Sequence, residues 1–125
     1  MFHGQPYCDA CGYEGPDFMW TWHHFMGYRV LVQNQASLEL RTIKVPDDEV
    51  FYNRAGRSEA DRARKRVAYV AAVIASGLRP GERHVPPEEF APANPFESED
   101  AAPHRTALVC PACRSHLLWR YTGIS

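Results

Sequence analysis

The chain lacks any long apolar run and any strong excess of charge. No stretch approaches the roughly 18 apolar residues that span a bilayer, and the N-terminus has no basic start followed by an apolar segment of the secretory kind. The formal net charge is -1 over 125 residues, so the net charge of the chain gives no electrostatic attraction to nucleic acid or anionic lipid. These absences predict a cytoplasmic protein without a membrane role, whose partners are recognised by local charge.

Cysteine is scarce too, because the chain has 4 cysteines and all of them lie in two CxxC pairs. The first pair is Cys8 and Cys11 in "CDACG", and the second is Cys110 and Cys113 in "CPAC". In a reducing compartment, pairs at this spacing are more often metal ligands or redox centres than structural disulfides. A thioredoxin-like redox pair starts a helix after a strand, and neither pair has that setting, so the pattern favours a metal site.

We expect one globular domain over residues 1–125. The apolar fraction of 45% excludes a wholly disordered chain, and the length allows one modest core. Residues 80–103 are rich in proline and acidic residues, which predicts a long irregular connection on the surface. Phe90 and Phe96 could anchor this connection to the core.

Alternating and β-branched residues predict strands on both sides of this connection. Residues 18–26 are apolar on both faces, as in a central strand, and residues 28–33 and 37–45 fit an antiparallel hairpin that turns at 34–36. Residues 106–109 lead into the second cysteine pair, and residues 116–121 fit a last strand. Together these segments predict an α+β fold with a small antiparallel sheet and one packed helix, in which both ends of the chain meet at the cysteines.

The clearest helix is predicted for residues 59–76. Ser58 is a suitable N-cap with Asp61 three positions on, and Gly77 stops the pattern before a proline. Apolar side chains recur on one side at helical spacing, so we expect that side to be buried. They are Ala60, Ala63, Val67, Val70, Ala71 and Ile74.

The other side of this helix is basic. Arg62, Lys65 and Arg66 share a face that Tyr69 continues, and such a face could bind phosphates and stack a base. A charged helix face is more often simply solvated, and the acidic residues of 82–103 could fold across this one and mask it. The pattern leaves a nucleic acid or a protein open as the partner.

A site made from all four cysteines suits zinc. Four thiolates satisfy a soft, tetrahedral ion without leaving an open position, which is typical of structural sites. Residues 12–109, 98 in all, separate the two pairs, and closing that loop costs about 4 kcal/mol. Zinc binding in small cysteine sites contributes about 10 to 16 kcal/mol, so the metal can offset that cost.

The segments "YCDACGYEGPDF" and "LVCPACRSHLLW" resemble the two knuckles of zinc-ribbon and rubredoxin-like proteins, whose paired CxxC turns lead into short strands. The resemblance implies a zinc cofactor, with iron as the alternative. It implies that the metal ligands are Cys8, Cys11, Cys110 and Cys113. Gly12 matches the glycine of the family, and it can take the positive φ that such a turn often needs. Arg114 stands where the second knuckle often has glycine.

The order of a cysteine pair, His23 and His24, and a second cysteine pair resembles metal-stabilised HNH nucleases. Those proteins use a ββα unit, whereas the span from His24 to Cys110 is far too long for one and no helix is evident after the second knuckle. A strand with one packed and one solvated histidine accounts for the pair as well. No nucleophile, base and orienting group can be assembled, so the sequence favours a binding module over a divergent nuclease or a rubredoxin-like electron carrier.

Overall fold

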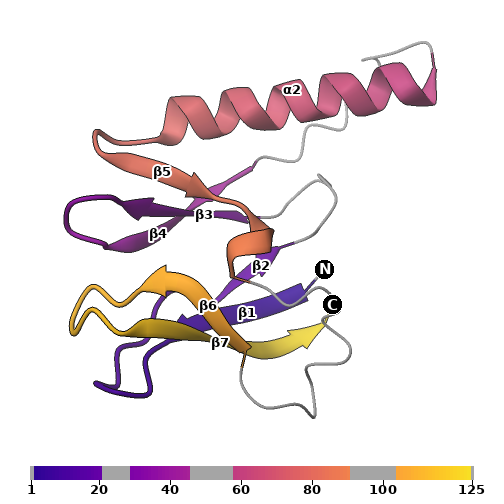
Figure 1. Ribbon diagram of the computed structural model, residues 1–125. Coiled ribbons are helices and arrows are strands. Elements are labelled where there is room, and N and C mark those ends of the chain that lie inside the picture. Colours follow the sequence, from indigo (N-terminus) through magenta and orange to yellow (C-terminus); the bar gives the residue numbers. More distant parts are fainter. Residues whose placement is uncertain (1, 21–28, 46–57, 91–103, 125) are drawn as a thin grey trace.

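The computed structural model describes residues 2–20, 29–45, 58–90 and 104–124. These ranges form three layers, with the helix α2 (Glu59–Gly77) on one side of a middle sheet and a terminal sheet on the other (Figure 1). All strand pairs in both sheets are antiparallel. The predicted α+β class is therefore confirmed, with two small sheets in place of the expected one.

The terminal sheet comes from the two ends of the chain. Its strand order is β2-β1-β7-β6. The strands are β1 (Phe2–Tyr7), β2 (Phe18–Trp20), β6 (His104–Val109) and β7 (His116–Ile124). The first and last strands, β1 and β7, pair from Phe2 with Ile124 to Tyr7 with Leu118, so the two ends lie side by side (Figure 1).

The middle sheet has the order β4-β3-β5 and contains the predicted hairpin. Its strands are β3 (Arg29–Asn34), β4 (Leu40–Lys44) and β5 (Glu82–Val85). The β3–β4 turn is closed by the Asn34 side chain, which accepts hydrogen bonds from the amides of Ala36 and Ser37, each at 2.9 Å. Such short-range side-chain bonds are the reason that asparagine favours turns.

The prediction of an irregular connection over 80–103 is wrong at its start. Residues 82–85 form β5, and the short 3₁₀ helix η1 (Pro87–Glu89) follows. The sequence does not indicate this strand because "ERHV" has little apolar content. The strand forms because pairing with β3 satisfies its backbone hydrogen-bonding groups. Phe90 does anchor the segment, with 1% of its surface exposed, whereas Phe96 lies outside the described residues.

Strand β3 is the centre of the fold because it is buried on both faces. Val30 and Val32 face α2, and Leu31 faces the terminal sheet. The core between the two sheets, called here the first core, consists of Cys8, Phe18, Leu31, Val85, Phe90, Leu108, Cys110, Leu117 and Trp119. The second core, between the middle sheet and α2, consists of Val30, Val32, Ile43, Val45, Val70 and Ile74.

Strand β2 corrects the prediction of a central strand over residues 18–26. Its described residues pair with β1 at the edge of the terminal sheet, because the other side of β1 is taken by β7. Phe18 reaches the first core, where its ring centroid lies 5.7 Å from that of Phe90 and 5.8 Å from that of Trp119. The rest of the predicted strand, with His23 and His24, lies outside the described residues.

The helix α2 begins as predicted and ends one residue later than predicted. Ser58 is the N-cap, and its Oγ accepts a hydrogen bond of 3.1 Å from the Asp61 amide. A Cβ atom on Gly77 would lie 3.0 Å from two carbons of Ile43, so the absence of a side chain lets the end of the helix approach β4. The C-terminal end of the helix therefore lies close against the middle sheet.

The buried face of α2 differs from the predicted one. Val70 and Ile74 are buried as expected, but Val67 and Ala71 are exposed. Tyr69 and Val73, from the other flank, pack against the second core instead. The helix carries apolar side chains on more sides than the one that faces the sheet, so the apolar pattern alone did not fix which side is covered.

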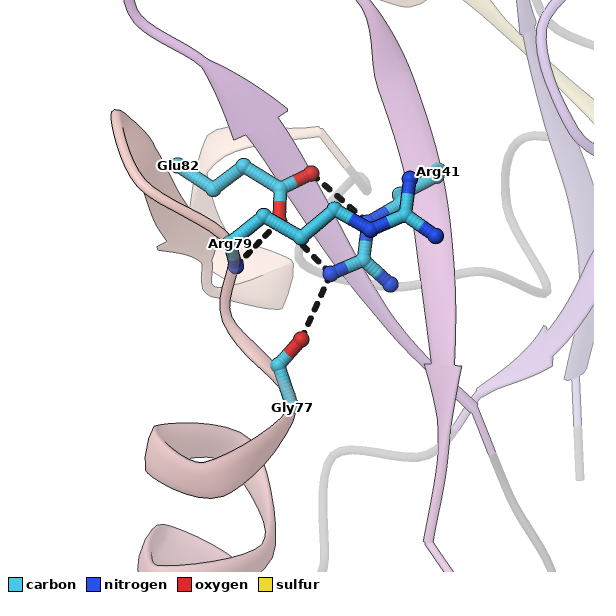
Figure 2. A network of polar contacts seen from close by, with 4 residues as sticks. All are labelled: Arg41, Gly77, Arg79 and Glu82. Atoms are coloured by element: carbon cyan, nitrogen blue, oxygen red, sulfur yellow. Dashed lines mark hydrogen bonds and ion pairs between the residues drawn. The ribbon is translucent and has the colours of Figure 1, made fainter.

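Arg41 joins α2 to two strands of the middle sheet (Figure 2). Its Nε and Nη2 donate to the two carboxylate oxygens of Glu82 at 2.7 and 2.6 Å, and Nη2 also donates to the Gly77 carbonyl at 2.6 Å. The Arg79 amide donates to the same carboxylate at 2.7 Å. The Glu82 side chain is only 6% exposed, so this ion pair ties the helix end, β4 and β5 together where water is largely excluded.

Candidate metal centre

The first knuckle is a tight turn between β1 and β2. The Cys8 amide donates to the Tyr13 carbonyl at 2.8 Å, and the Gly12 amide donates to the Cys8 carbonyl at 3.1 Å. Gly12 has a φ of 81°, the left-handed conformation that glycine adopts without strain. The sequence prediction for this glycine is confirmed.

The second knuckle, between β6 and β7, repeats the same hydrogen bonds. The Cys110 amide donates to the Ser115 carbonyl at 2.7 Å, and the Arg114 amide donates to the Cys110 carbonyl at 3.0 Å. Arg114 has a φ of 66° at the position that corresponds to the glycine of the first knuckle. The Ala112 amide points at the Cys110 Sγ, 3.4 Å away. The departure from glycine is therefore accommodated, and the second turn keeps its amide-to-sulfur geometry.

The two knuckles bring all four cysteines together. Each Sγ lies within 4.8 Å of the other three, and the four could hold one metal ion. The Sγ atoms of Cys8 and Cys113 are 3.4 Å apart, and those of Cys11 and Cys110 are 3.6 Å apart. A tetrahedral zinc ion with Zn–S bonds of about 2.3 Å needs sulfurs about 3.8 Å apart, so the donor set fits that ion.

The cluster has a buried side and an exposed side. Cys8 and Cys110 are 2% and 0% exposed and belong to the first core, whereas Cys11 and Cys113 are exposed. Each knuckle thus supplies one sulfur from the core and one from the surface. A metal held by all four would link the first core to the protein surface at the place where the chain ends meet.

The pKa values of the two exposed thiols, Cys11 and Cys113, are shifted in opposite directions. Hydrogen bonds from the hydroxyl and the amide of Ser115 lower the pKa of Cys113 to about 6. For Cys11 the Tyr13 amide also lowers the pKa, but desolvation and hydrogen bonds among the sulfurs outweigh it and raise the pKa to about 12. Four sulfurs this close cannot all be thiolates without a cation, so binding of a metal must release protons.

Two residues that the sequence did not single out support the centre. Ser115 bonds to Cys113, and its position two residues after that cysteine was the available signal. Gln33 of β3 is 5% exposed, and its Nε2 donates to the carbonyls of Leu38 at 3.1 Å and Val109 at 3.3 Å. Because Val109 directly precedes Cys110, this bond ties the second knuckle to the middle sheet. No pattern in the sequence marks that contact.

The contact residues predicted on α2 differ in how far they are exposed. Arg62 and Lys65 are exposed, and Tyr69 is half-buried against the second core. The side chain of Arg66 is outside the described part. Among the acidic residues of the described connection, Glu82 pairs with Arg41 and Glu89 with Arg83 at 2.9 Å, so the pairings seen for these two are not with α2.

The comparisons with protein-family models, curated proteins and solved structures found no match for this chain. Within the described residues, no helix is long and apolar enough to cross a membrane. Any assignment therefore rests on the four-cysteine cluster itself, whose geometry is consistent with a structural metal site.

Proposed function

We propose that the four cysteines hold one structural Zn²⁺ in a zinc-ribbon-like centre, and that the domain it stabilises is a small binding module. The observation that carries this is the cluster of four sulfurs within 4.8 Å, contributed equally by two knuckles with the same hydrogen bonds. Four thiolates are the donor set that structural zinc prefers, and they leave no coordination position open for a substrate.

A structural role is supported by where the centre lies. Cys8 and Cys110 are packed in the first core with Phe18 and Trp119, so an ion bound there acts on folding directly. When bound, the metal supplies a cross-link between the two ends of the chain. The chain itself orients the sulfurs, because the Tyr13 amide bonds to Cys11 in the first knuckle and the Ala112 amide bonds to Cys110 in the second.

Elemental analysis of the untagged protein tests the metal. We expect one equivalent of zinc in a colourless protein, and a chelator should lower the melting temperature. Cys8→Ser should lose both zinc and stability, whereas Ala10→Ser, in an exposed position of the same knuckle, should lose neither. A Cys8→Ser protein with unchanged zinc content and melting would contradict the proposal. A red protein that contains iron would instead support the alternative, a rubredoxin-like electron carrier.

For the partner, we propose the basic first half of α2 as the contact surface, with nucleic acid as the class to test first. Arg62 and Lys65 are exposed there. Lys65 lies 3.6 Å from Asp61, and Arg64 also pairs with Asp61. Exposed pairs of this kind are weak, so a phosphate can compete with the carboxylate for these cations. A protein with an acidic surface is the second class of partner.

A gel shift with single-stranded and double-stranded nucleic acid at low salt tests this surface. The double variant Arg62→Glu/Lys65→Glu should abolish the shift, whereas Arg105→Glu, an exposed charge reversal on β6, should weaken it only slightly. Binding should also fall steeply with added salt. Absence of a shift at low salt, or equal loss in both variants, would remove nucleic acid as the partner of this surface.

A further inference from the structure

Two short sulfur contacts in the cluster cross between the knuckles. The Sγ of Cys8 lies 3.4 Å from that of Cys113, and the Sγ of Cys11 lies 3.6 Å from that of Cys110. These contacts join residues 105 and 99 positions apart, although each cysteine also has a neighbour three positions away in its own knuckle. The contacts follow from the fold, because β1 and β7 lie side by side and bring the two knuckles together (Figure 1).

Each of these contacts joins an exposed sulfur to a buried one. Cys113 and Cys11 are exposed, whereas their partners Cys8 and Cys110 are 2% and 0% exposed in the first core. A dissolved oxidant reaches the exposed member of a pair first, and the buried member is already in contact with it. A reactive cysteine beside a resolving cysteine is typical of redox-sensitive sites, and the cluster holds this arrangement twice.

We propose that the cluster is a redox switch, in which a peroxide exchanges the bound zinc for two disulfides, Cys8–Cys113 and Cys11–Cys110. The inference rests on the zinc centre proposed above, since metal-bound cysteines are thiolates and the thiolate is the form that a peroxide oxidises. Both disulfides join the beginning of the chain to its end. The oxidised protein therefore loses the zinc but keeps a link between its two ends.

The reaction needs only the cluster, the peroxide and protons from water. The Cys113 sulfur attacks one oxygen of hydrogen peroxide, the O–O bond breaks, and the hydroxide that leaves takes a proton, so that Cys113 becomes a sulfenic acid. The Cys8 sulfur then attacks the Cys113 sulfur, which forms the S–S bond and expels a second hydroxide that also becomes water. The other pair reacts in the same way. In total, four thiolates, two peroxides and four protons give two disulfides and four waters, with release of Zn²⁺.

The alternative pairing is a disulfide within each knuckle. In an unfolded chain that pairing is favoured, because short loops close at the lowest cost in entropy. In the folded protein the pairing of β1 with β7 has already closed the long loop. Contact between sulfurs, rather than their spacing in the sequence, then decides which disulfides form, and the contacts cross between the knuckles.

Hydrogen peroxide added to the zinc-loaded full chain tests the exchange. We expect release of zinc, followed with a chromogenic chelator, together with the loss of four thiols, and a dithiol with added zinc should restore both. A protein purified without zinc would overturn the zinc centre and the switch together. A protein that keeps its zinc and its thiols would overturn the switch alone, as would sulfinic or sulfonic acids in place of disulfides.

Peptide mapping of the oxidised protein tests the pairing. Cleavage before Asp9 separates the peptide that holds Cys8 from the peptide that holds Cys11, and trypsin isolates the second cysteine pair in residues 106–114. The three peptides should be recovered as one linked species. Fragmentation between the two cysteines of 106–114 should leave the Cys8 peptide attached on the side of Cys113. Recovery of 106–114 without the other two peptides, or attachment on the opposite side, would overturn the proposal.

Two controls show whether the fold decides the pairing. The same oxidation in concentrated urea, after removal of the zinc, should give a disulfide within each knuckle, and crossed disulfides there would contradict the argument. Cys113→Ser leaves Cys8 without its partner, so this variant should form only the Cys11–Cys110 disulfide. A Cys8–Cys110 disulfide in that variant would overturn the stated pairs, and if the variant does not fold, the map of the wild type decides.

Discussion

Replacing Glu82 with Gln should destabilise the protein through the ion pair that joins the end of α2 to the middle sheet. The carboxylate accepts three short hydrogen bonds, two from Arg41 and one from the Arg79 amide. Hydrogen bonds to charged groups contribute about 1.5 to 3 kcal/mol each, and an amide keeps part of them. Arg41 is 27% exposed, so water compensates for part of the lost charge. We expect a loss of about 2 to 3 kcal/mol in the free energy of unfolding.

Thermal and urea unfolding of the purified protein measure this loss. For a domain of this size, 2 to 3 kcal/mol corresponds to a fall in Tm of about 10 °C. Glu88→Gln is the matched control, since it makes the same change at an exposed carboxylate in η1, and it should change Tm by less than about 2 °C. Equal melting of Glu82→Gln and the wild type would refute the reasoning that this pair stabilises the fold.

Three further predictions follow from the packing and the charges. Hydrogen bonds from Arg41 lower the pKa of Glu82 below its usual value of 4.5, so the stability difference between wild type and Glu82→Gln should be full at neutral pH and shrink as the pH falls below about 4.5, as acid unfolding would show. Gly4→Ala should cost about 1 to 3 kcal/mol in urea unfolding, because its Cβ would overlap the buried ring of Trp119, and unchanged stability would contradict this packing. After zinc removal, amide hydrogen exchange should accelerate more at Leu117, in the first core, than at Val70, in the second core, and equal acceleration would show that the metal acts on both cores alike.

Local patterns in the sequence were enough for the elements whose causes are local. The hairpin follows from alternating residues and a turn at Asn34, and the start of α2 follows from Ser58 and Asp61 three positions on. The four-cysteine cluster could also be predicted, because the CxxC spacing is a strong constraint and each pair can form the same turn. In these cases the determining residues lie within a few positions of one another.

What the sequence did not show depends on contacts between distant segments. Strand β5 is short and polar, and its pairing with β3 is invisible until the chain is folded. The partner of Glu82 is Arg41, a residue 41 positions away, so neither side chain could be recognised as part of a buried pair. The buried face of α2 differs from the predicted face for a related reason. Several faces of the helix are apolar, and the sheet covers only one of them.

The position of the four cysteines explains how one short chain supports two sheets with separate cores. The terminal sheet pairs the first strand with the last, and such a pairing closes nearly the whole chain into a loop, which is costly in entropy. The cysteine cluster lies at the end of that pairing, with Cys8 and Cys110 inside the first core, so one ion bound there would offset the closure cost at the point where it arises. The middle sheet and α2 have their own core, and the middle sheet reaches the first core through Leu31 of β3 and Val85 of β5, while Gln33 bonds to Val109. A metal bound at the cluster would thus act first on the ends of the chain, where β1 pairs with β7.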